Sequence, residues 1–171
     1  WQKIFNSFYC LRCLMYVEAK STFKKSKDEL LQVIKEPGNL ENYHPFCKKN
    51  EVQKWPGKGS VDFVEYHSGL SYTREFINWH ENGYDLIIRR KKELAEVNWI
   101  VKGNDQSSSL KVRINAKFPN INSFQKWFMW HFYVKFMLQS YINSVLKGFS
   151  FFVNSKQKVI PNQFGSHSWY S

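Results

Sequence analysis

Residues 124–153, FQKWFMWHFYVKFMLQSYINSVLKGFSFFV, decide the fold of this chain of 171 residues. The stretch contains no proline, and Gly148 is its only glycine. Large apolar residues recur in it at steps of three and four, the period of one helical face: Trp127, Trp130, Val134, Leu138, Tyr141, Val145, Phe149 and Phe152. A polar stripe with four-residue steps follows the opposite face: His131, Lys135, Gln139, Asn143 and Lys147. The pattern predicts one long amphipathic helix, capped by Ser123, that packs on a large apolar surface.

The length of this helix raises the question of whether it crosses a membrane. The window 127–146 is about long enough to span a bilayer. Lys135 lies in the middle of that window within the polar stripe, and a membrane-spanning helix rarely turns such a face toward lipid. We therefore expect the helix to pack on the protein itself.

The composition is that of one folded, basic domain. Hydrophobic residues make up 43% of the chain and charged residues 23%, which fits a globular protein rather than a disordered one. Aromatic residues reach 18%, which suits a wall that faces a bulky apolar ligand, although a genomic bias toward Phe, Tyr, Asn and Lys would give the same total. The net charge of +11 favours anionic partners, but the lysines are spread along the chain without a nucleic-acid motif, so we expect no DNA partner.

The segments before the long helix indicate a strand, two short helices and then a series of antiparallel strands. Residues 16–23 alternate in the manner of a strand, and Ser26 with Glu29 forms a capping box for a short helix. Asn39 can cap a second short helix that ends before Pro45. From residue 51 onward, period-two runs are separated by turns rich in glycine, asparagine and serine at 56–59, 68–69, 82–83 and 104–108.

The last of these runs, residues 110–118, alternates most regularly. It has Leu110, Val112 and Ile114 on the expected inward face and Lys111 and Arg113 on the outward face. We therefore predict an α+β fold with a curved antiparallel sheet of about six to seven strands, two short helices after the first strand, and a long C-terminal helix. One helix cannot fill the concave face of such a sheet, so we expect a large internal pocket.

This order of elements resembles the helix-grip fold of the START-like superfamily (SRPBCC), which includes lipid-transfer START domains, the birch-pollen allergen family and polyketide cyclase/dehydrase-like proteins. NLENYHPFC at 39–47 and EVQKWPG at 51–57 are similar to the passage from the short helices into the second strand of the cyclase-like members. Residues 148–167 are similar to the helix end and tail of one subgroup. The resemblance covers residues 15–171 and implies a hydrophobic ligand between the sheet and the long helix. Because the superfamily contains carriers, sensors and enzymes, it indicates the fold better than the function.

The resemblance leaves out the first residues of the chain. Residues 1–14 begin with Trp1, are too short to span a membrane and carry no signal-cleavage site. We expect an N-terminal extension at 1–14, disordered or a mis-assigned start, then a helix-grip domain at 15–160 and a tail at 161–171. Three cysteines in a chain of this length make no disulfide framework, which favours a cytoplasmic setting with at most peripheral contact to a membrane.

The predicted strand over residues 70–80 offers pocket candidates on either face. Tyr72, Arg74, Phe76 and Asn78 share one face, and Thr73, Glu75, Ile77 and Trp79 share the other. Whichever face is inward therefore brings one charge, Arg74 or Glu75, onto an apolar wall. An inward Arg74 can bind a ligand carboxylate or phosphate, but we favour a cross-strand ion pair, for example with Asp85 or Glu65.

Aromatic side chains are the other candidates for the pocket wall. The expected ligand-binding residues are Tyr72, Arg74, Phe76, Trp99, Trp127, Phe128, Trp130 and Tyr141. The alternative for each aromatic residue is ordinary core packing, which a sequence cannot distinguish from a ligand wall.

Catalytic and metal-binding motifs are weak. His44, with Tyr72 and Arg74, is a candidate for general acid–base work or for polarising a carbonyl, but spacing places no carboxylate or nucleophile beside it, and we favour a structural histidine in the turn before Pro45. The set Cys10, Cys13, His44 and Cys47 has the composition of a Cys₃His zinc site. Its first pair lies in the N-terminal extension, outside the family resemblance, so we expect free thiols, no metal and no cofactor.

The leading hypothesis is a non-catalytic carrier of a lipid-like, polyketide-like or isoprenoid-like molecule that docks transiently on an anionic membrane surface. Ligand access is expected through the long helix or the turns at 56–57 and 82–83. A cyclase- or dehydratase-type enzyme is the alternative, and a module that binds a protein or RNA is the third hypothesis.

Overall fold

Seven antiparallel strands form one sheet in the computed structural model, which describes residues 15–118 and 121–171. The chain begins with β1 (Tyr16–Phe23), α2 (Lys27–Lys35) and α3 (Leu40–Tyr43). Six strands follow: β2 (Cys47–Lys54), β3 (Val61–Tyr66), β4 (Ser71–His80), β5 (Gly83–Arg89), β6 (Glu93–Gly103) and β7 (Ser108–Ala116). A continuous helical segment ends the fold: α4 (Ser123–Met129), the π-helical turn η1 (Trp130–Val134) and α5 (Lys135–Ser155). The predicted α+β architecture is confirmed.

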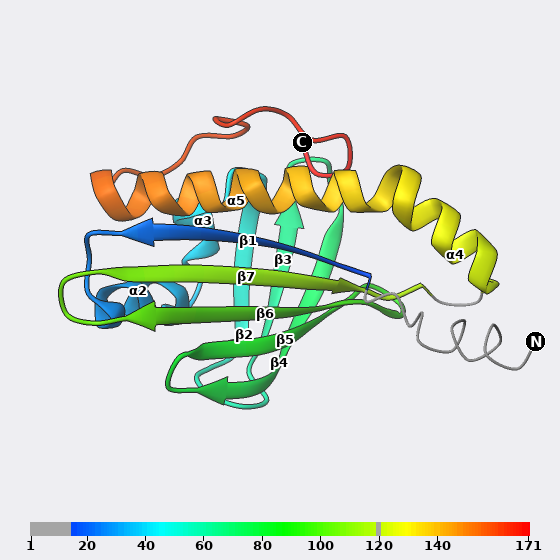
Figure 1. Ribbon diagram of the computed structural model, residues 1–171. Coiled ribbons are helices and arrows are strands. Elements are labelled where there is room, and N and C mark those ends of the chain that lie inside the picture. The colour runs from blue at the N-terminus through cyan, green and yellow to red at the C-terminus, as the bar shows by residue number, and fades with distance from the viewer. Residues whose placement is uncertain (1–14, 119–120) are drawn as a thin grey trace, which may run out of the picture.

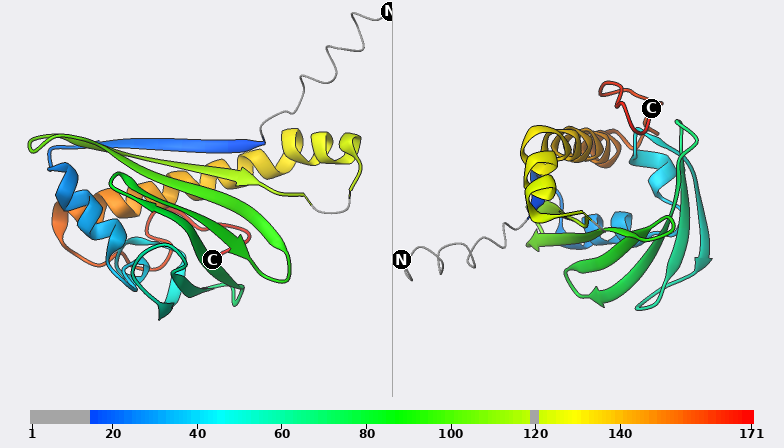
Figure 2. Two further views of the ribbon diagram at one scale, coloured as in Figure 1. Left: turned by 90° about the horizontal axis from the view of Figure 1, so that it is seen from below. Right: turned by 90° about the vertical axis from the view of Figure 1, so that its right-hand side faces the viewer.

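The sheet has the order β1-β7-β6-β5-β4-β3-β2, so β1 closes onto β7, and every neighbouring pair is antiparallel. It curves strongly, and α5 lies across the open side of the curve (Figures 1 and 2). The alternation in β6 and β7 sets the inner face, because Trp99 pairs with Val112 and Val97 with Ile114, and all four are buried. The inward face predicted for β7 is therefore confirmed.

The core lies between this face and α5. Phe149 of α5 is fully buried and packs edge-on against Tyr43 at 5.1 Å and Phe23 at 5.6 Å between ring centroids. Gly148 allows α5 to approach α3 closely, because a Cβ atom at this position would overlap the carbonyl oxygen of Tyr43. The helix therefore docks backbone to backbone at the segment that carries His44.

The helix caps agree with the sequence at one position and differ at two others. Asn39 precedes α3 as predicted, but its side chain makes no capping hydrogen bond and donates instead to the carbonyl oxygen of Val33 at 2.8 Å. Ser26 and Glu29 form the predicted capping box of α2. The long helix is capped by Asn122 rather than by Ser123: the Gln125 amide donates to Asn122 Oδ1 at 2.8 Å, and the Gln125 side chain accepts from the Asn122 amide at 3.3 Å. Asn122 and Gln125 thus form a complete capping box, and the N-cap lies one residue before the predicted position.

The predicted apolar face of the long helix is correct from Trp130 onward and wrong at Trp127, which is 43% exposed. The wide turn η1 changes the phase of the helix, so the three-and-four spacing of the buried face does not carry back across it to Trp127. Figure 1 shows that α4 bends away from α5 and extends beyond the end of the sheet. No helix among the described residues is long and apolar enough to cross a membrane.

Candidate functional site

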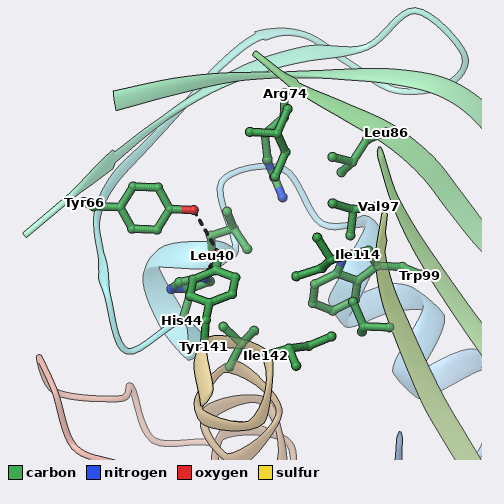
Figure 3. A pocket seen from close by; sticks show the side chains of 13 residues that line it. Leu40, His44, Tyr66, Arg74, Leu86, Val97, Trp99, Ile114, Tyr141 and Ile142 are labelled. Atoms are coloured by element: carbon green, nitrogen blue, oxygen red, sulfur yellow. Dashed lines mark hydrogen bonds between the residues drawn. The ribbon is translucent and has the colours of Figure 1, made fainter. Parts of the chain in front are cut away.

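An apolar cavity of about 40 Å³ lies between the sheet and α5 (Figure 3). Its wall combines aliphatic residues of α3, the strands and α5 with a few polar side chains: Leu40, His44, Tyr66, Arg74, Leu86, Ile88, Val97, Trp99, Val112, Ile114, Tyr141, Ile142 and Val145. The cavity is much smaller than the large pocket expected from the sequence. Fully buried Tyr43, Phe76, Tyr84 and Phe149 fill the space that the curved sheet encloses.

A second cavity of about 220 Å³ adjoins the first. Tyr66, Ile88, Ile114 and Tyr141 line both cavities, so these side chains form the partition between them. The remaining wall comes from Tyr72 of β4, from the start of β6, from the end of β7 and the residues after it, from Val134 and Leu138, and from the C-terminal residues Trp169 and Tyr170. Neither cavity is lined by the turns at 56–57 or 82–83, where ligand access was expected.

A chain of three hydrogen-bonded side chains forms the polar end of the first cavity. His44 ends α3, its Nδ1 accepts from the Phe46 amide at 3.2 Å, and its Nε2 lies 2.9 Å from the Tyr141 hydroxyl. The Tyr141 hydroxyl lies 2.9 Å from that of Tyr66 (Figure 3). Because Nδ1 accepts a hydrogen bond, the proton of the neutral ring is on Nε2, which donates to Tyr141.

Burial fixes the protonation states of this chain. It lowers the pKa of His44 to about 3, with a further lowering by the charge of Arg74, so the ring is neutral at physiological pH. Burial also raises the pKa of Tyr66 and of Tyr141 above the ordinary value, so both hydroxyls keep their protons. The chain therefore presents neutral hydrogen-bonding groups, and His44 is placed as a donor rather than as a general base.

We expect His44 to make the protein less stable in acid. The pKa is about 3 in the folded chain and 6.5 for a free side chain, so the unfolded state binds the extra proton between these values. Stability contributed by the neutral ring is complete above pH 6.5 and falls as the pH decreases, by about 1.4 kcal/mol per pH unit. Urea unfolding from pH 7 to pH 4 should show this slope in the parent and a shallower one in His44→Gln. Equal slopes in the two proteins would contradict the assignment.

Arg74 points inward from β4, as the sequence analysis allowed, and forms an ion pair. Its Nε donates to Asp62 Oδ1 at 2.7 Å, and Nη2 donates to Oδ2 of the same carboxylate. Burial alone would lower the pKa of Arg74, but the attraction of Asp62 outweighs it and raises that pKa. The partners suggested from the sequence are wrong: Asp85 binds Asn78 and Asn98, and Glu65 binds Lys48. Asp62 lies directly opposite Arg74 in the register of β3 and β4.

The face predicted for residues 70–80 is interrupted. A bulge between Phe76 and Asn78 turns Asn78 outward and brings Trp79 against Tyr84, where the two rings stack at 5.8 Å between centroids. The inward residues of β4 therefore change from Arg74 and Phe76 to Trp79, and the strict alternation assumed from the sequence does not hold.

The structure brings together only some of the predicted ligand-binding residues. Arg74, Trp99 and Tyr141 line the first cavity, and Tyr72 lines the second. Phe76 and Trp130 are buried outside both cavities, and Trp127 and Phe128 are exposed on α4. The catalytic candidates His44, Tyr72 and Arg74 are not gathered at one point, because Tyr72 faces the second cavity.

The C-terminal tail covers the second cavity, which the sequence analysis did not foresee. His167 is buried, and its Nε2 lies 3.0 Å from the carbonyl oxygen of Met137 in α5. Tyr170 packs on Tyr66 at 4.5 Å and on Tyr141 at 4.7 Å between ring centroids. The clue in the sequence is the group His167, Trp169 and Tyr170 at the end of an otherwise polar tail.

Only His44 and Cys47 of the four candidate zinc ligands lie among the described residues. Cys10 and Cys13 lie outside the described residues, and in the described ranges no three His, Cys, Asp or Glu side chains gather to hold a metal ion. Cys47 is buried, and burial raises the pKa of its thiol to about 12, which disfavours the thiolate that binds metals.

Comparison with known proteins finds similarity in structure. No family model and no curated sequence matches the chain. A START superfamily protein from Mycobacterium smegmatis matches 83% of this chain and 99% of its own length, with a TM-score of 0.59 and 11% identity. Ara h 8.0201 matches 82% and 97% (TM-score 0.58, 17% identity), and norcoclaurine synthase from Thalictrum matches 82% and 94% (TM-score 0.56, 13% identity). The START-like helix-grip fold predicted from the sequence is confirmed, and identities this low show the fold alone.

Proposed function

We propose that this protein of START-like helix-grip fold binds a small hydrophobic molecule with one polar group between its sheet and α5. The observation that carries the proposal is the cavity wall, which is aliphatic and aromatic except where Tyr66, Tyr141, His44 and the paired Arg74 meet it. Apolar burial, worth about 25 cal/mol per Å² removed from water, holds such a ligand, and the few polar groups orient it. A lipid-like, polyketide-like or isoprenoid-like molecule fits this description.

Binding requires the two cavities to join. The first cavity, at about 40 Å³, is too small for such a ligand. The second cavity has a volume of about 220 Å³, and the two together approach the smallest volumes of known ligand sites. Tyr66 and Tyr141 form the partition, and Tyr170 packs on both. Withdrawal of Tyr170 would free these rings to turn, so the tail is the proposed gate.

The hydroxyl of Tyr141 is the proposed contact for the polar group of the ligand. His44 Nε2 donates to it, which leaves the Tyr141 proton available for Tyr66 in the empty site or for a ligand oxygen in the filled one. A hydroxyl or carbonyl oxygen suits this donor.

Farnesol and its hydrocarbon analogue farnesene test this contact by calorimetric titration. We expect Tyr141→Phe to weaken farnesol binding roughly tenfold, the value of one hydrogen bond in an apolar site, and to leave farnesene binding nearly unchanged. Tyr16→Phe is the matched control, since Tyr16 lies half-buried at the start of β1 outside both cavities. Equal losses for both probes, or no binding of either, would overturn the proposal.

The same geometry supports binding better than the alternative of cyclase-type catalysis. Norcoclaurine synthase has a related fold and is an enzyme. In this chain, however, His44 is neutral, with its Nδ1 engaged by the Phe46 amide, and the tyrosines hold their protons. These groups orient a ligand oxygen but take up no proton near neutral pH. The net charge of +11 supports the further proposal that the ligand is exchanged at an anionic membrane surface.

A further inference from the structure

The start of the long helix carries an aromatic surface that packs on no part of the core. None of the residues of α4 is buried. Trp130 and Val134 of η1 are buried, but seven other large apolar side chains of α4, η1 and the first turn of α5 are exposed to unusual degrees: Phe124 72%, Trp127 43%, Phe128 51%, Met129 42%, Phe132 62%, Tyr133 50% and Phe136 64%. An exposed apolar patch of this kind in a folded protein indicates an interaction site.

Four phenylalanines form a stripe along this surface. Phe124, Phe128, Phe132 and Phe136 are spaced by four residues, and the rings of Phe128 and Phe132 lie 4.8 Å apart between centroids. In a regular α-helix a four-residue spacing drifts steadily around the axis. The wide turn η1 holds more residues per turn and reverses that drift, so it keeps the stripe on one side of the helix.

The charge around the stripe selects its partner. None of the 14 acidic residues of the chain lies after Asp105, whereas eight lysines and arginines do. Lys126 and Lys135 lie on the aromatic segment itself. The exposed basic turn Arg90-Lys91-Lys92 lies at the same end of the sheet as the start of α4. The amide of Lys117, which follows β7, donates to the carbonyl of Leu94, two residues after that turn.

We propose that α4, η1 and the first turn of α5 form an interfacial docking element for an anionic lipid bilayer. Aromatic rings with lysines and no acidic residue are the composition of helices that lie at the boundary between head groups and acyl chains. Two copies of the chain are a poorer fit for each other, since their contact would bring Lys126 and Lys135 of both into one acid-free interface. A projecting helix also lacks the groove that nucleic-acid sites use to follow a phosphate backbone.

The docking element lies close to the second cavity. Only this link between membrane docking and the ligand site rests on the proposed function. The second cavity is lined by Phe118, which precedes the docking element in sequence, and by Val134 and Leu138, which belong to the element but are buried. Figure 1 places α4 beyond the same end of the sheet at which β7 ends. A bilayer bound there would lie next to the mouth of the ligand site.

Vesicle flotation of the full chain tests the docking element without any cavity ligand. We expect the protein to float with vesicles of phosphatidylcholine and phosphatidylserine in equal parts, and only weakly with phosphatidylcholine alone. Phe132→Ala/Phe136→Ala should weaken the binding at least about tenfold, since two exposed rings no longer enter the interface. Ile160→Ala, which removes an equally exposed apolar side chain from the tail, should bind as the parent does.

A charge-reversal pair tests whether the basic turn belongs to the same surface. Lys91→Glu/Lys92→Glu should reduce binding to the anionic vesicles by about tenfold or more. Lys24→Glu/Lys158→Glu changes the net charge by the same amount at exposed positions outside the docking element and should have a much smaller effect. Equal losses in the two variants would mean that bulk charge, not this surface, binds the membrane, and would overturn the proposal.

Three further outcomes would overturn it. One is binding that Phe132→Ala/Phe136→Ala leaves unchanged. Another is a dimer in native mass spectrometry that the same variant converts to monomer, which would assign the stripe to a second copy. The third is a chain that does not bind vesicles but binds single-stranded RNA through the same phenylalanines. Farnesol binding should be unaffected by these substitutions, so failure of the docking proposal and failure of the ligand proposal are distinguishable.

Discussion

Replacing Asp62 by alanine is expected to lower the free energy of unfolding by about 3–5 kcal/mol, because it leaves the guanidinium of Arg74 buried without its counter-charge. The carboxylate is almost fully buried and accepts two hydrogen bonds from that guanidinium. Urea unfolding at neutral pH measures the loss. The same change also leaves a free cation at the edge of the first cavity.

A double-mutant cycle separates the pair from simple loss of packing. Arg74→Met removes the cation, and the double variant Asp62→Ala/Arg74→Met should cost much less than the sum of the single changes. The surface pair of Arg89 with Glu75 is the matched control, because both side chains are more than 40% exposed and Arg89→Met should cost less than about 1 kcal/mol. Additive costs for Asp62 and Arg74 would show that the two residues do not act as a pair.

Gly148→Ala is expected to destabilise the protein by about 2–3 kcal/mol or more, the cost of forcing extra volume into a packed contact. The new Cβ would overlap the carbonyl oxygen of Tyr43, so α5 must move away from α3. Helix propensity alone predicts the opposite, a gain of about 1 kcal/mol from alanine in a helix. The sign of the change in thermal or urea stability therefore decides between the two effects.

The neighbouring residue provides the control for Gly148. Lys147 lies on the exposed side of α5, and Lys147→Ala should change stability by less than about 0.5 kcal/mol. Because Gly148 sets the distance between α5 and the segment of His44, its substitution should also disturb the bond between His44 and Tyr141. A stabilised Gly148→Ala variant would mean that α5 and α3 are not in close contact.

The sequence was sufficient for the architecture because its main signals are periodic. The alternation in β7 and the three-and-four spacing from Trp130 to Phe149 each follow from one-sided burial, and both are confirmed. The capping box at Ser26 and Glu29 is a local motif, which needs no tertiary information.

The site depends on features that local patterns do not encode. The bulge after Phe76 and the wide turn η1 each break a regular period, so Asn78 and Trp127 lie on faces that strict periodicity would not assign. Asp62 is the partner of Arg74 because of the register between two strands, and Tyr170 reaches the cavity because the tail folds back over α5. Long-range pairing of this kind cannot be read from one sequence.

The most direct test of ligand binding is native mass spectrometry of the full chain purified from cells, followed by solvent extraction and identification of the released molecules. The account predicts an apolar molecule with one polar group bound at near-stoichiometric occupancy, and loss of that molecule in the Tyr141→Phe variant but not in Tyr16→Phe. A chain that emerges empty and takes up neither farnesol nor farnesene would contradict it, and the aromatic interior would then be core alone.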